Sequence, residues 1–187
     1  MRIRPSQDTP IVRRALPIYA LLAASSTAAL SGEPTPERAA IAFLNAYEPL
    51  GAGGLPPLKR MTSLLKYSSP DLSTLLNKAA TLEEASRCEG PPTIEGDLLW
   101  SLAEGAQSWT LGQCKASDGH AVCEVTLRHS DPKPSVNTLV WAEELVLVRS
   151  SHAWLVDNVR STATWATNRQ LKDRLRTSIQ QNEQCAR

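Results

Sequence analysis

The stretch 108–128, SWTLGQCKASDGHAVCEVTLR, contains the pattern that decides the fold. Its two apolar runs flank Asp118-Gly119, a dipeptide that favours a two-residue hairpin turn because both turn positions need a positive φ. Counting outward from this turn places Cys114 opposite Cys123 in a non-hydrogen-bonded pair, whose Cα atoms lie about 4.5 Å apart. A disulfide tolerates that separation. We therefore predict an antiparallel hairpin closed by a Cys114–Cys123 disulfide.

The remaining cysteines, Cys88 and Cys185, pair by elimination, although four cysteines allow three connectivities. Such a bond would join the C-terminal helix to the helical layer. For Cys114 and Cys123 the alternatives are two free thiols or half of a zinc site. A zinc site favours a compact CxxC pair or converging histidines, and the sequence has neither. We expect no metal and no cofactor.

Helical patterns lie on either side of a strand-rich region. Two further strands are predicted beyond the hairpin, at about 138–148 and 153–160. Apolar residues recur at helical spacing in four stretches, which are residues 36–48, a segment opening at Pro56-Pro57, residues 69–85 and residues 168–183. This order predicts an α+β domain, in which N-terminal helices pack on a curved antiparallel sheet of about four strands and a C-terminal helix closes the fold.

Residues 1–31 have the three parts of a secretory signal peptide. Four arginines against Asp8 give the start of the chain a net charge of +3, and a short apolar stretch follows at 15–24. Cleavage after Ala29-Leu30-Ser31 would leave Gly32 as the new N-terminus. A membrane anchor is the alternative, but the apolar stretch is shorter than the ~20 residues of a spanning helix. The pair Arg13-Arg14 leaves general and twin-arginine export both open.

Removing the leader changes the charge of the chain. Of 20 Lys+Arg and 19 Asp+Glu, residues 32–187 keep 16 and 18, so 16 − 18 gives −2 in place of +1. A mildly acidic domain has no electrostatic reason to bind nucleic acid or an anionic membrane surface. The composition, 42% hydrophobic and 21% charged, excludes a disordered chain. We expect residues 32–187 to form a single periplasmic or secreted domain without a membrane span.

The stretch 144–159, ELVLVRSSHAWLVDNV, resembles the last hairpin of the nuclear-transport-factor-two-like (cystatin-like) cone folds. The stretches 92–100 and 108–112 are similar to a segment of small secreted bacterial proteins of unknown function with that fold. The resemblance spans residues 36–183 and implies a cone-shaped α+β domain. It says little about chemistry, because this fold hosts isomerases, dehydratases, hydrolases and binding modules.

Enzymes with this fold place an Asp, or an Asp and a His, in a concave cavity for general acid–base chemistry. Burial in an apolar pocket raises the pKa of such a base toward neutrality. The candidates in this chain are Asp157, Asp97, Glu143, Glu144 and His129. Asp157 alternates with Leu155 and Val159 and would share their face. In the structural alternative, Asp157 hydrogen-bonds a backbone group or pairs with an arginine at a strand end.

The chain has five tryptophans and one phenylalanine. Three of them, Trp109, Trp141 and Trp154, lie on predicted strands and are expected to pack in the core. Trp100 and Trp165 lie outside the strands and are candidate contacts for a ligand or a partner.

The sequence favours an exported periplasmic protein that binds a protein partner or a small ligand without catalysis. One alternative is a cavity enzyme of the isomerase, dehydratase or hydrolase type, with Asp157 as general base. Another is an immunity-type protein that neutralises a toxin delivered to the periplasm, which fits the compartment and the size.

The predicted disulfide connectivity is tested by mass mapping of a non-reduced digest. We expect one peptide pair that contains Cys114 and Cys123, and a second that contains Cys88 and Cys185. A peptide that joins Cys88 to either hairpin cysteine would contradict the connectivity.

Overall fold

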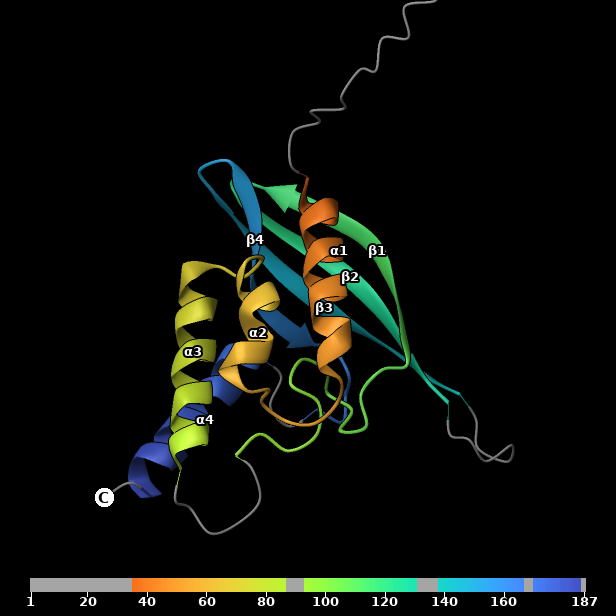
Figure 1. Ribbon diagram of the computed structural model, residues 1–187. Coiled ribbons are helices and arrows are strands. Elements are labelled where there is room, and N and C mark those ends of the chain that lie inside the picture. Colours follow the sequence, from red (N-terminus) through yellow and green to blue (C-terminus); the bar gives the residue numbers. More distant parts are fainter. Residues whose placement is uncertain (1–34, 87–92, 131–137, 167–169, 186–187) are drawn as a thin grey trace, which may run out of the picture. The chain divides into compact units, whose positions relative to one another are not determined.

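The sheet is an antiparallel meander of four strands in the order β1-β2-β3-β4 (Figure 1). The strands are β1 Ser108–Ser117, β2 His120–His129, β3 Leu139–Ser150 and β4 Ala153–Ser161. The structure is a computed structural model and describes residues 35–86, 93–130, 138–166 and 170–185. The predicted leader and Cys88 lie outside the described residues. All four predicted strands are confirmed, and the bounds predicted for the last two, 138–148 and 153–160, are shifted by at most two residues.

The predicted hairpin is confirmed in turn, register and disulfide. Asp118 has φ 48° and Gly119 has φ 77°, as a primed two-residue turn requires. Ser117 pairs with His120 at the turn, and Cys114 pairs with Cys123 further along the strands. The two cysteines form a disulfide with a Cα–Cα distance of 4.0 Å.

Beyond the disulfide, β1 contains a bulge that the turn pattern did not predict. Leu111 pairs with Val125 and Cys114 with Cys123, so one strand carries an extra residue between these pairs. Gly112 and Gln113 together lie opposite Glu124. A bulge leaves its extra residue unpaired and increases the local twist.

The helices are α1 Pro36–Tyr47, α2 Leu58–Leu65, α3 Pro70–Ala85 and α4 Leu171–Cys185, with a short 3-10 turn at Glu48–Leu50. Two of them begin with a hydroxyl cap followed by proline, a sequence that favours a helix start. The Oγ1 of Thr35 accepts a hydrogen bond from the Arg38 N–H. The Oγ of Ser69 accepts one from the Leu72 N–H.

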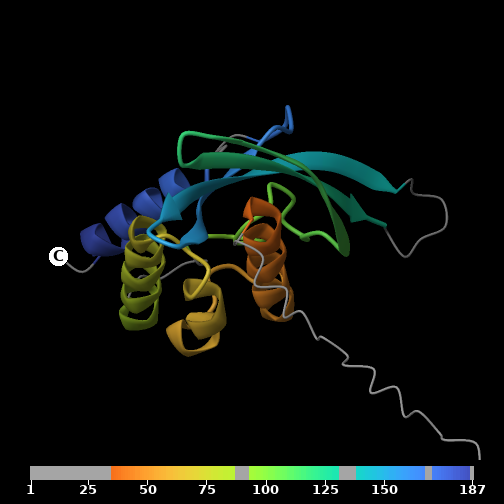
Figure 2. The same ribbon diagram turned by 90° about the horizontal axis from the view of Figure 1, so that it is seen from above.

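The helices cover one face of the sheet, and the core lies between the two layers (Figure 2). On β2 every second side chain is buried, and on β3 burial alternates from Trp141 to Leu147. Phe43 and Leu44 of α1 meet this inner face and are also buried. Trp141 and Trp154 belong to the core, as predicted, whereas Trp109 is only partly buried against it. The α+β class, with helices on an open four-stranded sheet and a closing C-terminal helix, is therefore confirmed.

The two edges of the sheet differ. The β4 edge is covered, because Ser69 N–H donates to the Val156 carbonyl and Val156 N–H donates to the Tyr67 carbonyl. A second bridge joins Arg160 of β4 to Gln170. Among the described residues no strand pairs with the free edge of β1.

A second bulge lies in β4, and it overturns the expected alternation around Asp157. Val146 pairs with Asn158 but Leu147 pairs with Val156, so Asp157 is the extra residue. The shift places Val159 in the core while Leu155 stays half-exposed. Asp157 therefore does not share one face with both.

The described residues contain no helix that is both long enough and apolar enough to cross a membrane.

Candidate functional site

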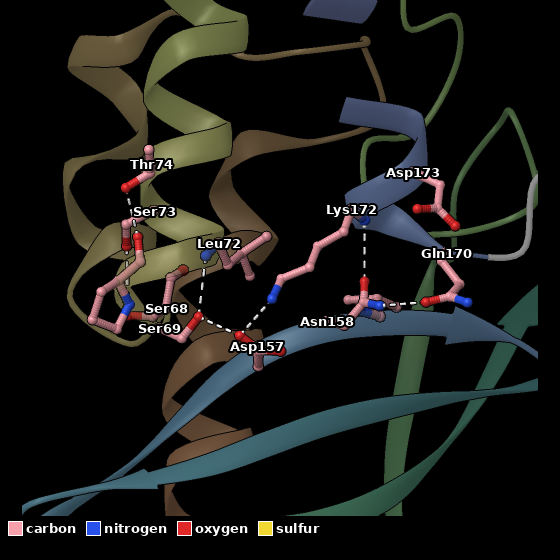
Figure 3. A network of polar contacts seen from close by, with 12 residues as sticks. Ser68, Ser69, Leu72, Ser73, Thr74, Asp157, Asn158, Gln170, Lys172 and Asp173 are labelled. Carbon is pink, nitrogen blue, oxygen red and sulfur yellow. Dashed lines mark hydrogen bonds and ion pairs between the residues drawn. The ribbon is translucent and has the colours of Figure 1, made fainter. Parts of the chain in front are cut away.

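The β4 bulge directs Asp157 toward the helical layer (Figure 3). Its Oδ1 accepts hydrogen bonds from Ser69 Oγ and from Lys172 Nζ, both at 2.6 Å. The side chains are largely covered, with exposed fractions of 12% for Lys172 and 22% for Asp157. Ser69 also caps α3, so one carboxylate joins the start of α3, the bulge of β4 and the first turn of α4.

The neighbouring Asn158 fixes the start of α4 (Figure 3). Its Oδ1 accepts a hydrogen bond from the Lys172 N–H at 3.1 Å, and its Nδ2 donates to Gln170 Oε1 at 2.8 Å. The first N–H groups of a helix have no partner within the helix. Asn158 therefore acts as a cap supplied from another element.

This geometry keeps Asp157 ionised. Burial by itself would raise the pKa of Asp157, but the hydrogen bonds from Lys172 and Ser69 and the charge of Lys172 outweigh burial and lower it. A general base for chemistry near neutral pH needs the opposite shift. The arrangement agrees with the structural alternative for Asp157, with a lysine in place of the expected arginine.

A second acidic residue, Asp97, is buried in the loop between α3 and β1 and is only 3% exposed. Its Oδ1 accepts hydrogen bonds from Tyr47 Oη at 2.5 Å, from Leu99 N–H at 2.8 Å and from Trp100 N–H at 2.9 Å. Burial, and then the charge of Asp97, raise the pKa of Tyr47, so the phenol stays protonated and donates. Asp97 thus pairs backbone groups that would otherwise be buried without partners.

Glu143 plays a similar part on β3 and is 1% exposed. Its Oε1 accepts hydrogen bonds from Ser101 N–H at 2.7 Å and from Trp141 Nε1 at 3.1 Å. The loop is thereby tied to the inner face of the sheet. The neighbouring Glu144 lies on the other face and forms an ion pair with Arg160 at 2.7 Å.

Arg174 of α4 completes this buried cluster. Its guanidinium donates to the carbonyls of Asp97 at 2.6 Å, Leu98 at 3.1 Å and Trp100 at 3.5 Å. Burial raises the pKa of Asp97 and of Glu143, although hydrogen bonds and the charge of Arg174 oppose the rise. Burial lowers the pKa of Arg174, which both carboxylates oppose.

The space beside this cluster is very small. A cavity of about 10 Å³ lies between Glu143 and Arg174, next to Ser101. A volume of that size holds about one water molecule. The oxygens of Asp97 and Glu143 that bond the loop therefore serve to hold it in place, and the cavity has no room for an organic substrate.

The sequence identified the acidic residues of these clusters but missed their cations, Lys172 and Arg174. Both lie in the first turn of α4, where the helix dipole disfavours positive charge. The helix predicted from the sequence spans residues 168–183, which places both cations beyond its first turn, so the sequence pattern did not indicate them.

The other candidate residues are dispersed. His129 Nδ1 lies 2.9 Å from the Gly105 carbonyl, while His120 and His152 are exposed at the two turns. Trp100 is buried and meets Tyr47 edge-to-face, with ring centroids 6.1 Å apart. Trp165 is 48% exposed. A contact of Trp165 with a ligand or a partner stays a prediction, whereas Trp100 is placed in the core.

The uncovered face of the sheet carries a larger hollow, of about 250 Å³. It lies beside the β1 bulge, across β1, β2 and β3. The residues that line it are mostly polar, and they are Gln113, Lys115, Val122, Glu124 and Glu144.

Comparison with protein-family models, with curated proteins and with solved structures gives no match. Within the described parts of the chain, no group of three or more His, Cys, Asp or Glu side chains is arranged to hold a metal ion.

Replacing Asp157 tests its structural role. The folded-state pKa of Asp157 lies below its ordinary value of 3.8, so its stabilisation is complete above that pH and is lost as the pH falls through the folded-state value. We expect Asp157→Asn to lower the free energy of unfolding by about 1–3 kcal/mol at neutral pH. The difference from the unmodified protein should shrink as the pH falls below 3.8, as measured by urea unfolding over a pH series.

Asp173→Asn is the matched control, because Asp173 forms an exposed ion pair with Arg176 on the same helix. It should change the free energy of unfolding by less than about 1 kcal/mol. Equal losses in the two variants would contradict a special role for Asp157.

Replacing Arg174 tests the buried cluster. Arg174→Met leaves the carboxylates of Asp97 and Glu143 without their cation, and we expect a loss of about 3–5 kcal/mol in the free energy of unfolding. Adding Glu143→Gln to this variant should restore part of the loss, because it removes one uncompensated buried charge. Thermal unfolding of Arg174→Met, of Glu143→Gln and of the double variant measures the effect. If the loss in the double variant equals the sum of the two single losses, the charges are not coupled.

Proposed function

We propose that this chain is an exported protein of the periplasm or the extracellular space that binds a protein partner without catalysis, through the outer face of its sheet. The outer face is the side opposite the helices. The observation that carries the proposal is the hollow of about 250 Å³ on this face. Val140 lies on the same face and is 46% exposed.

The acidic residues that were candidates for a general base already have internal partners, and this supports a non-catalytic role. Asp157 is held by Lys172 and Ser69, while Asp97 and Glu143 are hydrogen-bonded to buried loop amides. A catalytic carboxylate must instead meet a substrate proton at hydrogen-bonding distance. An enzyme that uses Asp157 would first have to break its ion pair.

Two features support export. The first is the signal-peptide pattern of residues 1–31. The second is the Cys114–Cys123 disulfide, a bond that persists in oxidising compartments. The helices on a four-stranded antiparallel sheet agree with membership of the nuclear-transport-factor-two-like superfamily, which we propose on the resemblance of the last hairpin.

A capture experiment with two matched variants tests the proposed surface. Val140→Asp places a charge on the outer face, and Ile41→Asp places the same charge on α1, where Ile41 is 40% exposed. We expect the processed protein to capture a partner from periplasmic extract. Val140→Asp should reduce the recovery at least about tenfold, a change that corresponds to about 1.4 kcal/mol. Ile41→Asp should leave it unchanged.

Recovery that is lost in Ile41→Asp but kept in Val140→Asp, or recovery that is the same for both variants, would contradict a partner site on the outer face. Turnover of a substrate that is lost in Asp157→Asn would favour the enzyme alternative.

A further inference from the structure

The hollow on the outer face lies at an unusual row of charges. Glu124 of β2 pairs directly with Glu144 of β3, and Glu144 pairs in turn with Arg160 of β4. Like charges opposite each other on neighbouring strands destabilise a sheet. Arg160 neutralises Glu144 through an ion pair at 2.7 Å, so this end of the row is compensated.

At the other end of the row, no cation on β1 lies directly opposite Glu124. The β1 bulge places Gly112 and Gln113 opposite Glu124. Among the described residues, neither Glu124 nor Lys115 forms an ion pair within 4.0 Å. The lining of the hollow therefore holds two carboxylates and one ammonium, and of the two carboxylates only Glu144 is ion-paired.

Gly112 keeps this end open. A Cβ added at Gly112 would lie 3.3 Å from the Glu124 carbonyl oxygen, 3.4 Å from Glu124 Cβ and 3.7 Å from Glu124 Oε1. Any side chain at this position would press against Glu124. With glycine here, the Glu124 carboxylate is accessible from the β1 side.

We infer that the hollow receives a lysine or arginine side chain of the partner protein, whose cationic head lies against Glu124 and completes the charge row. Val122, which also lines the hollow, suits the aliphatic stem of such a side chain, because lysine and arginine bury their stems along apolar surface. Lys115 lines the same hollow and competes for Glu124. This inference rests on the proposed function and specifies the chemistry of its partner.

The probe is N-acetyl-arginine amide, compared with the neutral isostere N-acetyl-citrulline amide. Each is titrated into the isotope-labelled processed protein, and the backbone amide shifts of Gly112, Gln113 and Glu124 are followed by NMR. We expect saturable shifts with the arginine probe in the millimolar range, weakened by salt, and at least about threefold weaker binding of the citrulline probe.

Three variants test which charged side chains determine the binding of the arginine probe. Glu124→Gln should weaken arginine binding about threefold or more, whereas Glu104→Gln, which removes an exposed carboxylate outside the hollow, should not change it. Lys115→Ala should tighten binding about twofold because it removes the competing cation. A structural role for Glu124 alone would not produce this gain.

Equal binding of the two probes, absence of shifts at these three amides, or weaker binding in Lys115→Ala would each overturn the inference. The outcome is separable from that of the capture experiment. If capture depends on Val140 but arginine does not bind, the inferred cation site in the hollow is wrong, and the proposed partner site on the outer face is retained. If arginine binds but capture does not depend on Val140, the proposed function fails.

Discussion

Much of this fold depends on the hydrogen bonds that Arg174 donates to the carbonyls of a buried loop. The described part of the loop between α3 and β1, residues 93–107, forms no helix or strand, yet Ile94, Leu98, Leu99 and Trp100 are buried. Buried backbone groups must be paired. One guanidinium supplies the loop carbonyls and two carboxylates supply the loop amides, so the loop becomes part of the core.

The same logic explains the bulge of β4. A regular strand would have placed Asp157 in the alternating pattern of its neighbours. The extra residue instead places Asp157 and Asn158 beside α4, where they bind the side chain and the N–H of Lys172. Asp157, Asn158 and Lys172 thus use their polar atoms for contacts between β4 and α4.

The sequence predicted the strands, the helices and the hairpin register, because these follow from local turn chemistry and periodicity. Asp118-Gly119 alone was enough to pair Cys114 with Cys123. The two bulges were not predictable in this way, because a register shift depends on what both strands pack against. Asp97 and Glu143 were recognised as candidates, but their roles depend on Arg174, which lies far away in the sequence. In a sequence, a catalytic base cannot be told from a buried structural carboxylate, because the hydrogen-bond donors around each are not known.

Hydrogen exchange at the amides of Leu99, Trp100 and Ser101 measures directly whether this loop belongs to the core. These N–H groups donate to the buried carboxylates of Asp97 and Glu143. If the loop is part of the core, they should exchange only through large-scale unfolding, with protection that approaches that of the central strands β2 and β3. Exchange at the rates of an unstructured peptide would contradict the claim that Arg174 and the two acids build this loop into the core.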